Sequence, residues 1–275
     1  MVVALLVLVL GGVALVLSGV LDGDERAGTG STTTTASTVP DEVVAQRPDG
    51  WPPLPTDVSA EPLGEPGPVP GEGGAHSFVT RQRDGFTPVG YDPCRPIRYV
   101  TRPGGPPAGD ELIREAVEMV SAATGLQFVD EGHTDEGPSE SREPYQPERY
   151  GERWAPVLIT WSNPTESPQL AEPAAGDEHV DVAGHAGSMS VALTTTDRRT
   201  GETTETGFVY VTGSVTLDEY VVARTLEQPG GHARARAVVA HELGHLVGLG
   251  HVDDPEQLMY PQARPEVTEF GPGDL

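Results

Sequence analysis

Apolar and polar positions follow three different patterns along the chain. Residues 1–21 are uncharged and almost wholly apolar, residues 22–87 show no apolar periodicity, and residues 88–275 alternate apolar segments with polar turns. The first pattern predicts a helix that would just cross a hydrocarbon core of about 30 Å. Because it has no charged n-region and no A-x-A site, we expect an uncleaved membrane anchor, with a cleaved signal segment as the alternative. Either interpretation implies export.

The second pattern predicts a disordered linker over residues 22–87. It includes the Ser/Thr-rich string TGSTTTTAST and the Pro/Gly/Glu-rich string WPPLPTDVSAEPLGEPGPVPGEGG. Neither string can bury enough apolar surface to offset the entropy of ordering its backbone. A stalk that holds a domain away from the membrane is the simplest use of such a segment.

The third pattern predicts an α+β domain over residues 88–275. After Asp110, a plausible N-cap, apolar residues recur at helical spacing until Gly125. A second helix is expected at about 233–247. Together they indicate one mixed sheet with two main helices, in the order β-α-β-β-β-β-α. Apolar or β-branched runs predict the strands, with a hairpin formed by the last two: 96–101, 126–129, 156–161, 188–196 and 207–218.

Charge narrows the range of partners. The formal net charge is -25, and every one of the 17 basic residues is an arginine. A chain this acidic is repelled by phosphate backbones, which argues against nucleic acid as a partner. We interpret the acidic excess as a solvated surface, with a preference for cationic substrates as the alternative. The single cysteine, Cys94, cannot form an internal disulfide.

Three of the eight histidines lie in the string HELGHLVGLGH, residues 241–251. On a helix, His241 and His245 project from the same face, so both imidazoles can reach one metal ion. Glu242 can reach a water on that metal without binding the metal itself. Gly248 can end the helix in a left-handed turn, which lets His251 meet the same ion. Three protein ligands leave a fourth position for water, as a catalytic zinc requires.

This string resembles the metzincin signature H-E-x-x-H-x-x-G-x-x-H, and LMYP, residues 258–261, resembles the Met-turn. The resemblance is closest to the matrixin branch of these zinc metallopeptidases and spans roughly residue 91 to the C-terminus. It implies a metzincin-like zincin fold with a mixed, mostly parallel twisted sheet. It also implies one catalytic Zn²⁺ on the three histidines, with Met259 as a hydrophobic floor beneath the metal. The implied activity is a zinc-dependent endopeptidase in which Glu242 activates a zinc-bound water as the nucleophile.

Several positions depart from the matrixin pattern. Val252 stands where matrixins usually have a serine, and Ala263 stands where a tyrosine usually lines the pocket just beyond the scissile bond. Cleavage specificity therefore does not carry over. His179, Asp181 and His185 faintly resemble the structural zinc site of matrixins, but a fourth ligand is absent. We therefore expect neither structural zinc nor structural calcium.

Two further features of the family are weak in this chain. Matrixin precursors block their zinc with a propeptide cysteine in a P-R-C-G-x-P setting, whereas Cys94 stands in DPCRPI, only three residues before Ile97. We expect an inert thiol, with a latency switch as the alternative. Metzincins usually finish with a helix after the Met-turn. TEFGPGDL stops where that helix would begin, so we expect it to be missing, although Asp274 could cap its start.

The resemblance therefore implies an endopeptidase that acts on extracellular proteins or peptides. We expect a monomer that is either a single-pass membrane protein with an extracellular catalytic domain or a secreted protein. Its polypeptide substrate would lie extended along an edge strand, near Ser188–Thr195. The alternative keeps the metal but not the catalysis: a zinc-containing peptide-binding module at the cell surface.

Overall fold

The computed structural model of the chain describes residues 5–6, 51–53, 55–68, 73–171, 181–197 and 200–275. Within these residues one five-stranded sheet has the order β3-β2-β4-β7-β6. The first four strands are mutually parallel, and β6 runs antiparallel to β7 at the edge. The predicted mixed, mostly parallel sheet is confirmed. Its strands are β2 (Ile97–Arg102), β3 (Phe128–His133), β4 (Val157–Ser162), β6 (Gly184–Thr196) and β7 (Thr203–Asp218).

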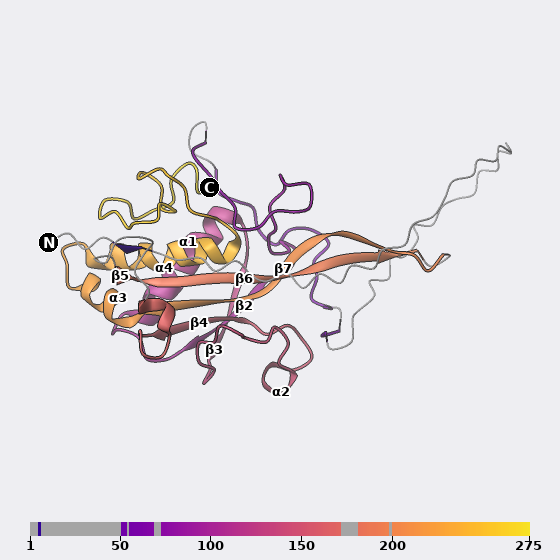
Figure 1. Cartoon of the computed structure of the whole chain (residues 1–275), viewed down its shortest axis with the longest axis horizontal. Coiled ribbons are helices and arrows are strands. Elements are labelled where there is room, and N and C mark those ends of the chain that lie inside the picture. Colours follow the sequence, from indigo (N-terminus) through magenta and orange to yellow (C-terminus); the bar gives the residue numbers. More distant parts are fainter. Residues whose placement is uncertain (1–4, 7–50, 54, 69–72, 172–180, 198–199) are drawn as a thin grey trace.

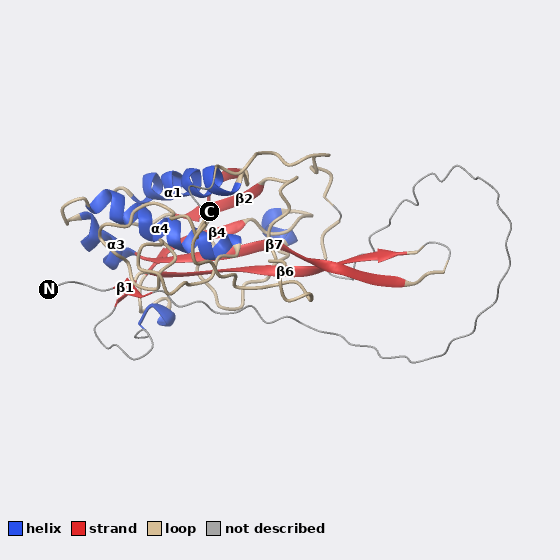
Figure 2. Ribbon diagram, turned by 90° about the horizontal axis from the view of Figure 1, so that it is seen from above, coloured by secondary structure: helices blue, strands red, loops and turns tan. Residues whose placement is uncertain are grey.

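Two long helices, α1 (Gly109–Thr124) and α4 (Gly231–Val247), pack side by side on one face of the sheet (Figures 1 and 2). Leu112, Ile113 and Val120 of α1 are fully buried there. They join Leu243 and Leu246 of α4 in a single hydrophobic core. The predicted pair of main helices on an α+β sheet is therefore confirmed.

The helix boundaries differ in detail from the prediction. Helix α1 begins at Gly109, and no side chain caps it, so Asp110 lies in its first turn rather than at its N-cap. The pattern also missed α3 (Glu219–Leu226), which follows β7 directly. The buried carboxylate of Asp218 starts α3 by accepting hydrogen bonds from the backbone N–H groups of Tyr220 and Val221.

The predicted hairpin is longer than its two apolar runs. Strands β6 and β7 pair from Gly184↔Leu217 to Thr196↔Thr203. Figure 1 shows them running out together beyond the body of the domain. The first part of β6 lies next to α4: Gly184 lies against Glu242, and Ser188 Oγ donates to Leu246 O at 2.6 Å.

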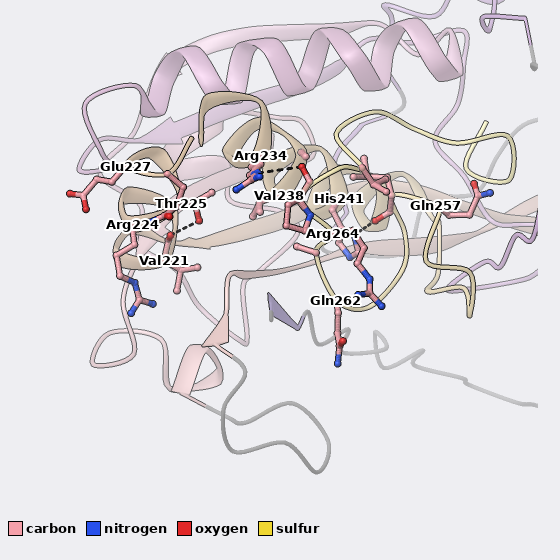
Figure 3. Close-up of a pocket in the computed structure, with 16 residues that line it drawn as sticks. Val221, Arg224, Thr225, Glu227, Arg234, Val238, His241, Gln257, Gln262 and Arg264 are labelled. Carbon is pink, nitrogen blue, oxygen red and sulfur yellow. Dashed lines mark hydrogen bonds between the residues drawn. The ribbon is translucent and has the colours of Figure 1, made fainter. Parts of the chain in front are cut away.

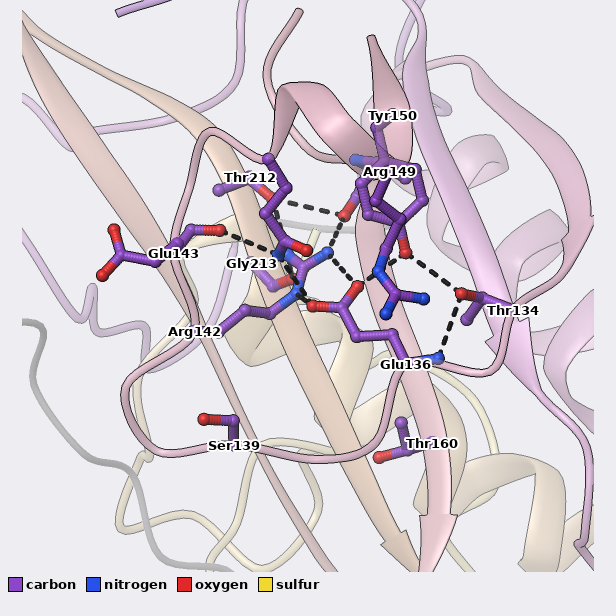
Figure 4. A network of polar contacts seen from close by, with 12 residues as sticks. Thr134, Glu136, Ser139, Arg142, Glu143, Arg149, Tyr150, Thr160, Thr212 and Gly213 are labelled. Carbon is purple, nitrogen blue, oxygen red and sulfur yellow. Dashed lines mark hydrogen bonds and ion pairs between the residues drawn. The ribbon is translucent and has the colours of Figure 1, made fainter. Parts of the chain in front are cut away.

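A long loop covers the face of the sheet opposite the helices, over residues 134–156, and contains only the short helix α2 (Pro147–Tyr150). Its centre is the buried ion pair between Arg142 and Glu136, whose side chains are 7% and 12% exposed (Figure 4). Arg142 also donates to Thr212 Oγ1 and to the carbonyls of Gly213 and Pro156. Because every strong donor here has an acceptor, the loop is held firmly to the sheet.

The predicted linker over 22–87 needs correction for its C-terminal part. Residues 22–50 lie outside the described residues. Residues 55–68 and 73–87, however, lie against the domain without forming a helix or a long strand. Backbone groups make many of the contacts, for example from Ser59 N–H to Cys94 O and from Gly67 N–H to Ala122 O. Side chains add others, such as Asp57 to Arg98 and Gln82 to the backbone of Phe208. A composition that cannot build its own core can still be ordered by hydrogen bonds to an existing one.

The predicted apolar N-terminal helix lies almost wholly outside the described residues. Of residues 1–21 the structure describes β1 (Leu5–Leu6), which pairs in parallel with β5 (Asp181–Val182). Nowhere in the described parts of the chain is a helix both long and apolar enough to cross a bilayer.

Candidate metal centre

Helix α4 and the turn that follows it bring three imidazoles together. His241 and His245 lie one turn apart on α4, as the spacing predicts, and His251 follows the helix. The Nε2 atom of His251 is 3.2 Å from that of His241 and 3.1 Å from that of His245. Among the described residues, these three form the one group of three or more side chains placed closely enough to hold a metal ion together.

Backbone carbonyls fix the orientation of two of the rings. His241 Nδ1 donates to Leu258 O at 2.7 Å, and His245 Nδ1 donates to Leu249 O at 2.8 Å. A carbonyl oxygen can only accept, so Nδ1 carries the proton of each neutral ring and Nε2 presents a lone pair. Both lone pairs face the third histidine. This is the arrangement in which outer hydrogen bonds orient metal-binding histidines.

The three nitrogens fit a zinc ion. Two nitrogens bound to one tetrahedral zinc at 2.0–2.1 Å are about 3.3 Å apart, close to the two N–N distances in this site. Burial holds the pKa of all three imidazoles below the usual value, to about 3 for His241 and about 4 for His251, and well below it for His245. Neutral imidazole is the form that binds a metal, so the surroundings favour a cation over protons.

Glu242 lies beside this cluster and is fully buried. Neither of its carboxylate oxygens has a hydrogen-bond partner within the described protein. Desolvation alone raises the pKa of this carboxyl well above its usual range. A Cβ atom at Gly184 of β6 would lie only 2.9 Å from Glu242 Cγ, so a side chain larger than hydrogen there would collide with this glutamate. An unpartnered buried carboxyl is costly and marks a functional group.

The turn after α4 depends on Gly248, which has φ = +115° and ends the helix in the left-handed region. A segment from the predicted linker holds this turn. Val79 N–H donates to Gly248 O at 2.9 Å, and Gly250 N–H donates to Ser77 O at 2.8 Å. Phe78 and Leu249 form an antiparallel bridge between these bonds. We call residues 77–79 the strap, because they fix the turn that delivers His251.

Met259 lies beneath α4 and is 1% exposed. A Cβ atom at Gly244 would come within 2.6 Å of its sulfur, so glycine is what allows the methionine to pack against the helix. Asp274 holds the Met-turn from outside. Its buried carboxylate accepts from the backbone N–H groups of Leu258 at 2.7 Å and Met259 at 3.3 Å. No helix forms over residues 248–275, and within this segment Asp274 supports the Met-turn.

A pocket of about 510 Å³ opens beside His241, between α3, α4 and the segment after the Met-turn (Figure 3). Val221, Ala237, Val238 and Leu258 form its apolar wall, and Ala263 is at its edge. Three arginines also line it: Arg224, Arg234 and Arg264. The pocket was not predicted from the sequence. The one available signal was Ala263, a small side chain at a position where matrixins usually have a tyrosine in the pocket wall.

The other candidate residues are not gathered into a site. His179 lies outside the described residues, and Asp181 pairs with Arg224. His185 lies on β6 near Glu140 and belongs to no group of three or more possible metal ligands among the described residues. Cys94 lies before β2, and burial together with Asp92 raises the pKa of its thiol. This environment favours the inert thiol form.

One comparison with known proteins, a match to a family model, agrees with the motif. Residues 173–271 match the family model described as Matrixin. The resemblance to the matrixin branch is thus confirmed over that segment, which contains β5 to α4 and the metal centre. No match was found among curated proteins. The archaemetzincin of Methanopyrus kandleri, a solved structure, is similar at 18% identity and a TM-score of 0.33, covering 64% of this chain and 86% of that one.

Proposed function

We propose that this chain, whose residues 173–271 are matrixin-like, is a zinc-dependent endopeptidase that hydrolyses peptide bonds of extracellular proteins or peptides. One observation carries the proposal. A fully buried glutamate without a hydrogen-bond partner, Glu242, lies beside three histidines whose Nε2 atoms converge. A purely structural metal site has no need for such a costly group.

His241, His245 and His251 would hold the zinc ion through Nε2. When bound at such a site, zinc acts as a Lewis acid on the scissile carbonyl and lowers the pKa of water to about 7. Glu242 then accepts the proton of the attacking water on a carboxylate oxygen and passes it to the departing amine.

The substrate would lie extended along the free edge of the sheet, which is formed by β6. We place the substrate beside residues 184–188 of β6, at the start of and just before the expected stretch Ser188–Thr195, because Gly184 lies against Glu242 and Ser188 contacts α4. We further propose an exported monomer, either anchored by residues 1–21 or secreted. A peptide-binding module that carries zinc without catalysis is the competing function.

The test is cleavage of a broad peptide library by the zinc-loaded full chain, compared with Glu242→Ala. We expect the wild type to cleave internal bonds and the variant to keep its zinc but lose activity by at least about 100-fold, the usual contribution of a general base. Zinc content by mass spectrometry is the control. A zinc-loaded wild type that cleaves nothing in the library would contradict the peptidase proposal and leave the peptide-binding module.

A further inference from the structure

The pocket beside His241 carries positive charge that no carboxylate among the described residues neutralises by an ion pair. Of the described arginines, all but three form an ion pair with Asp or Glu. The exceptions are Arg81, Arg234 and Arg264, and the last two line this pocket. In a chain with a net charge of -25, two arginines without a carboxylate partner at one pocket stand out from the rest of the surface.

The two arginines differ in their exposure to solvent. Arg234 is half-buried on α4, where its Nε donates to Pro265 O at 3.3 Å. Arg264 is exposed, and its guanidinium lies 5.1 Å from the centre of the Tyr260 ring. Neither contact neutralises the charge. The third arginine, Arg224, pairs with Asp181, and the acidic lining residue Glu227 is exposed.

The spacing along α4 defines what can reach the charge. Arg234 and His241 lie seven residues apart, on the same helix face and about 10 Å apart along the axis. Ala237 and Val238 lie between them and form part of the apolar wall (Figure 3). A side chain that enters beside His241 therefore crosses apolar surface before it meets a guanidinium. An apolar stem with a terminal carboxylate matches this order of environments.

We infer that Arg234 and Arg264 make this pocket a specificity pocket for glutamate, at a substrate position that flanks the cleaved bond. Guanidinium groups bind carboxylates through charge-assisted, often bidentate hydrogen bonds. The overall negative charge of the chain does not prevent this, because exposed charges beyond about 8 Å are largely screened at physiological salt. The inference rests on the proposed function and runs against a general preference for cationic substrates.

The test uses quenched fluorescent peptides that carry either glutamate or its neutral counterpart glutamine at each position around one cleavable bond. We expect the full-length wild type to cleave the best glutamate peptide about tenfold faster, in kcat/KM, than its glutamine counterpart. Arg234→Met keeps the apolar stem and should remove most of this preference, leaving the glutamine peptide within about twofold of wild type. Arg264→Gln should show the same pattern more weakly, because Arg264 is exposed.

Controls separate specificity from damage. Arg114→Gln removes an exposed arginine of α1 and should change neither rate. Because Arg234→Met also removes the bond to Pro265, its zinc content and unfolding midpoint are measured. If Arg234→Met does not fold, Arg264→Gln at the exposed position still tests the inference. Equal rates on glutamate and glutamine peptides in the wild type, or equal losses on both in the arginine variants, would overturn the inference.

A binding measurement distinguishes this inference from the proposed function. Glu242→Gln is expected to bind peptides without cleaving them, so fluorescence polarisation can compare the glutamate and glutamine peptides directly. If the wild type cleaves nothing but Glu242→Gln binds the glutamate peptide more tightly, the endopeptidase proposal fails and the pocket inference stands. If binding is equal for both peptides, the inference fails whether or not cleavage occurs.

Discussion

The two faces of the sheet carry buried polar groups of opposite character. On the face opposite the helices, under the loop over residues 134–156, Arg142 and Glu136 are buried together. Glu136 also accepts from Tyr150 and Gln146. On the helical face, Glu242 is buried with no partner within the described protein, beside histidine lone pairs that face one another. The first group is complete as it stands and stabilises the fold. The second has no satisfying group among the described residues, which is the character expected of a group kept for binding or chemistry.

Among the substitutions, the largest expected effect comes from breaking the satisfied group. Arg142→Met leaves the Glu136 carboxylate buried without its cation, and we expect a loss of about 3–5 kcal/mol in the free energy of unfolding. Urea unfolding of the full chain measures it. Arg149→Met, which breaks the exposed pair with Asp135, should cost less than about 1 kcal/mol. A similar small loss for both variants would show that the buried network behaves like a surface ion pair.

Replacing the unsatisfied carboxyl of Glu242 should raise the free energy of unfolding rather than lower it. In the metal-free protein, Glu242→Met replaces an unpartnered buried carboxyl with an apolar side chain of similar length, and we expect a gain of about 1–3 kcal/mol. Because the folded pKa of Glu242 is raised, the contribution of this carboxyl to wild-type stability falls as the pH rises above about 4.5, so the gain should grow from pH 5 to 7.5. Urea unfolding with a chelator measures it, and the exposed Glu148→Met is the control. A loss of stability at both pH values would contradict the contrast between the faces.

Acid should separate the two faces without any mutation. Burial lowers the pKa of His241 and His251 to about 3 and about 4. An unfolded histidine binds its proton near pH 6.5 but the folded one does not, so each imidazole should lower metal-free stability between pH 6.5 and 4 by up to about 1.4 kcal/mol per unit. The three imidazoles together outweigh the opposite contribution of the single Glu242 carboxyl, so the net stability should fall. Burial acts to raise the pKa of Glu136, but hydrogen bonds from Arg142, Tyr150 and Gln146 outweigh burial, so the net pKa is lowered. The buried network around Glu136 should therefore lose its contribution to stability only below about pH 4.5. A stability that stays flat from pH 6.5 to 4.5 would be inconsistent with neutral buried histidines.

The smallest effect should come from the strap. Val79→Pro removes the N–H that donates to Gly248 O, which loosens the turn before His251. We expect a loss of about 1 kcal/mol in stability and a drop of about tenfold in zinc affinity, as for other residues that orient a metal ligand. Val79→Ala keeps the N–H and is the matched control. Competition with a zinc-binding dye measures the affinity, and equal affinity for both variants would show that the strap does not position His251.

How far the sequence predicted the molecule depends on how local each interaction is. His241, Glu242 and His245 share two turns of one helix, and Gly248 needs only its own backbone angle, so spacing was sufficient to place them. The strap was not predictable, because it contacts the turn through backbone groups that have no residue signature.

The missed helix and the missed support of the Met-turn have related causes. Helix α3 follows β7 without a break, so the β-branched run concealed its start, although Asp218 followed by Glu219 was an available cap signal. The contact of Asp274 with Leu258 and Met259 spans about fifteen residues and depends on a loop path that no periodicity defines. The sheet order likewise follows from pairing between distant strands.

The two carbonyls that hold His241 and His245 also influence how readily an ion can be bound. Side chains that are free to rotate would lose rotamer freedom when they close around a cation, and that loss would weaken the affinity. Here the folded backbone restricts both rings before any ion arrives, through Leu258 O and Leu249 O. Most of the ordering therefore accompanies folding, which leaves a preorganised site whose metal binding has a small entropic penalty.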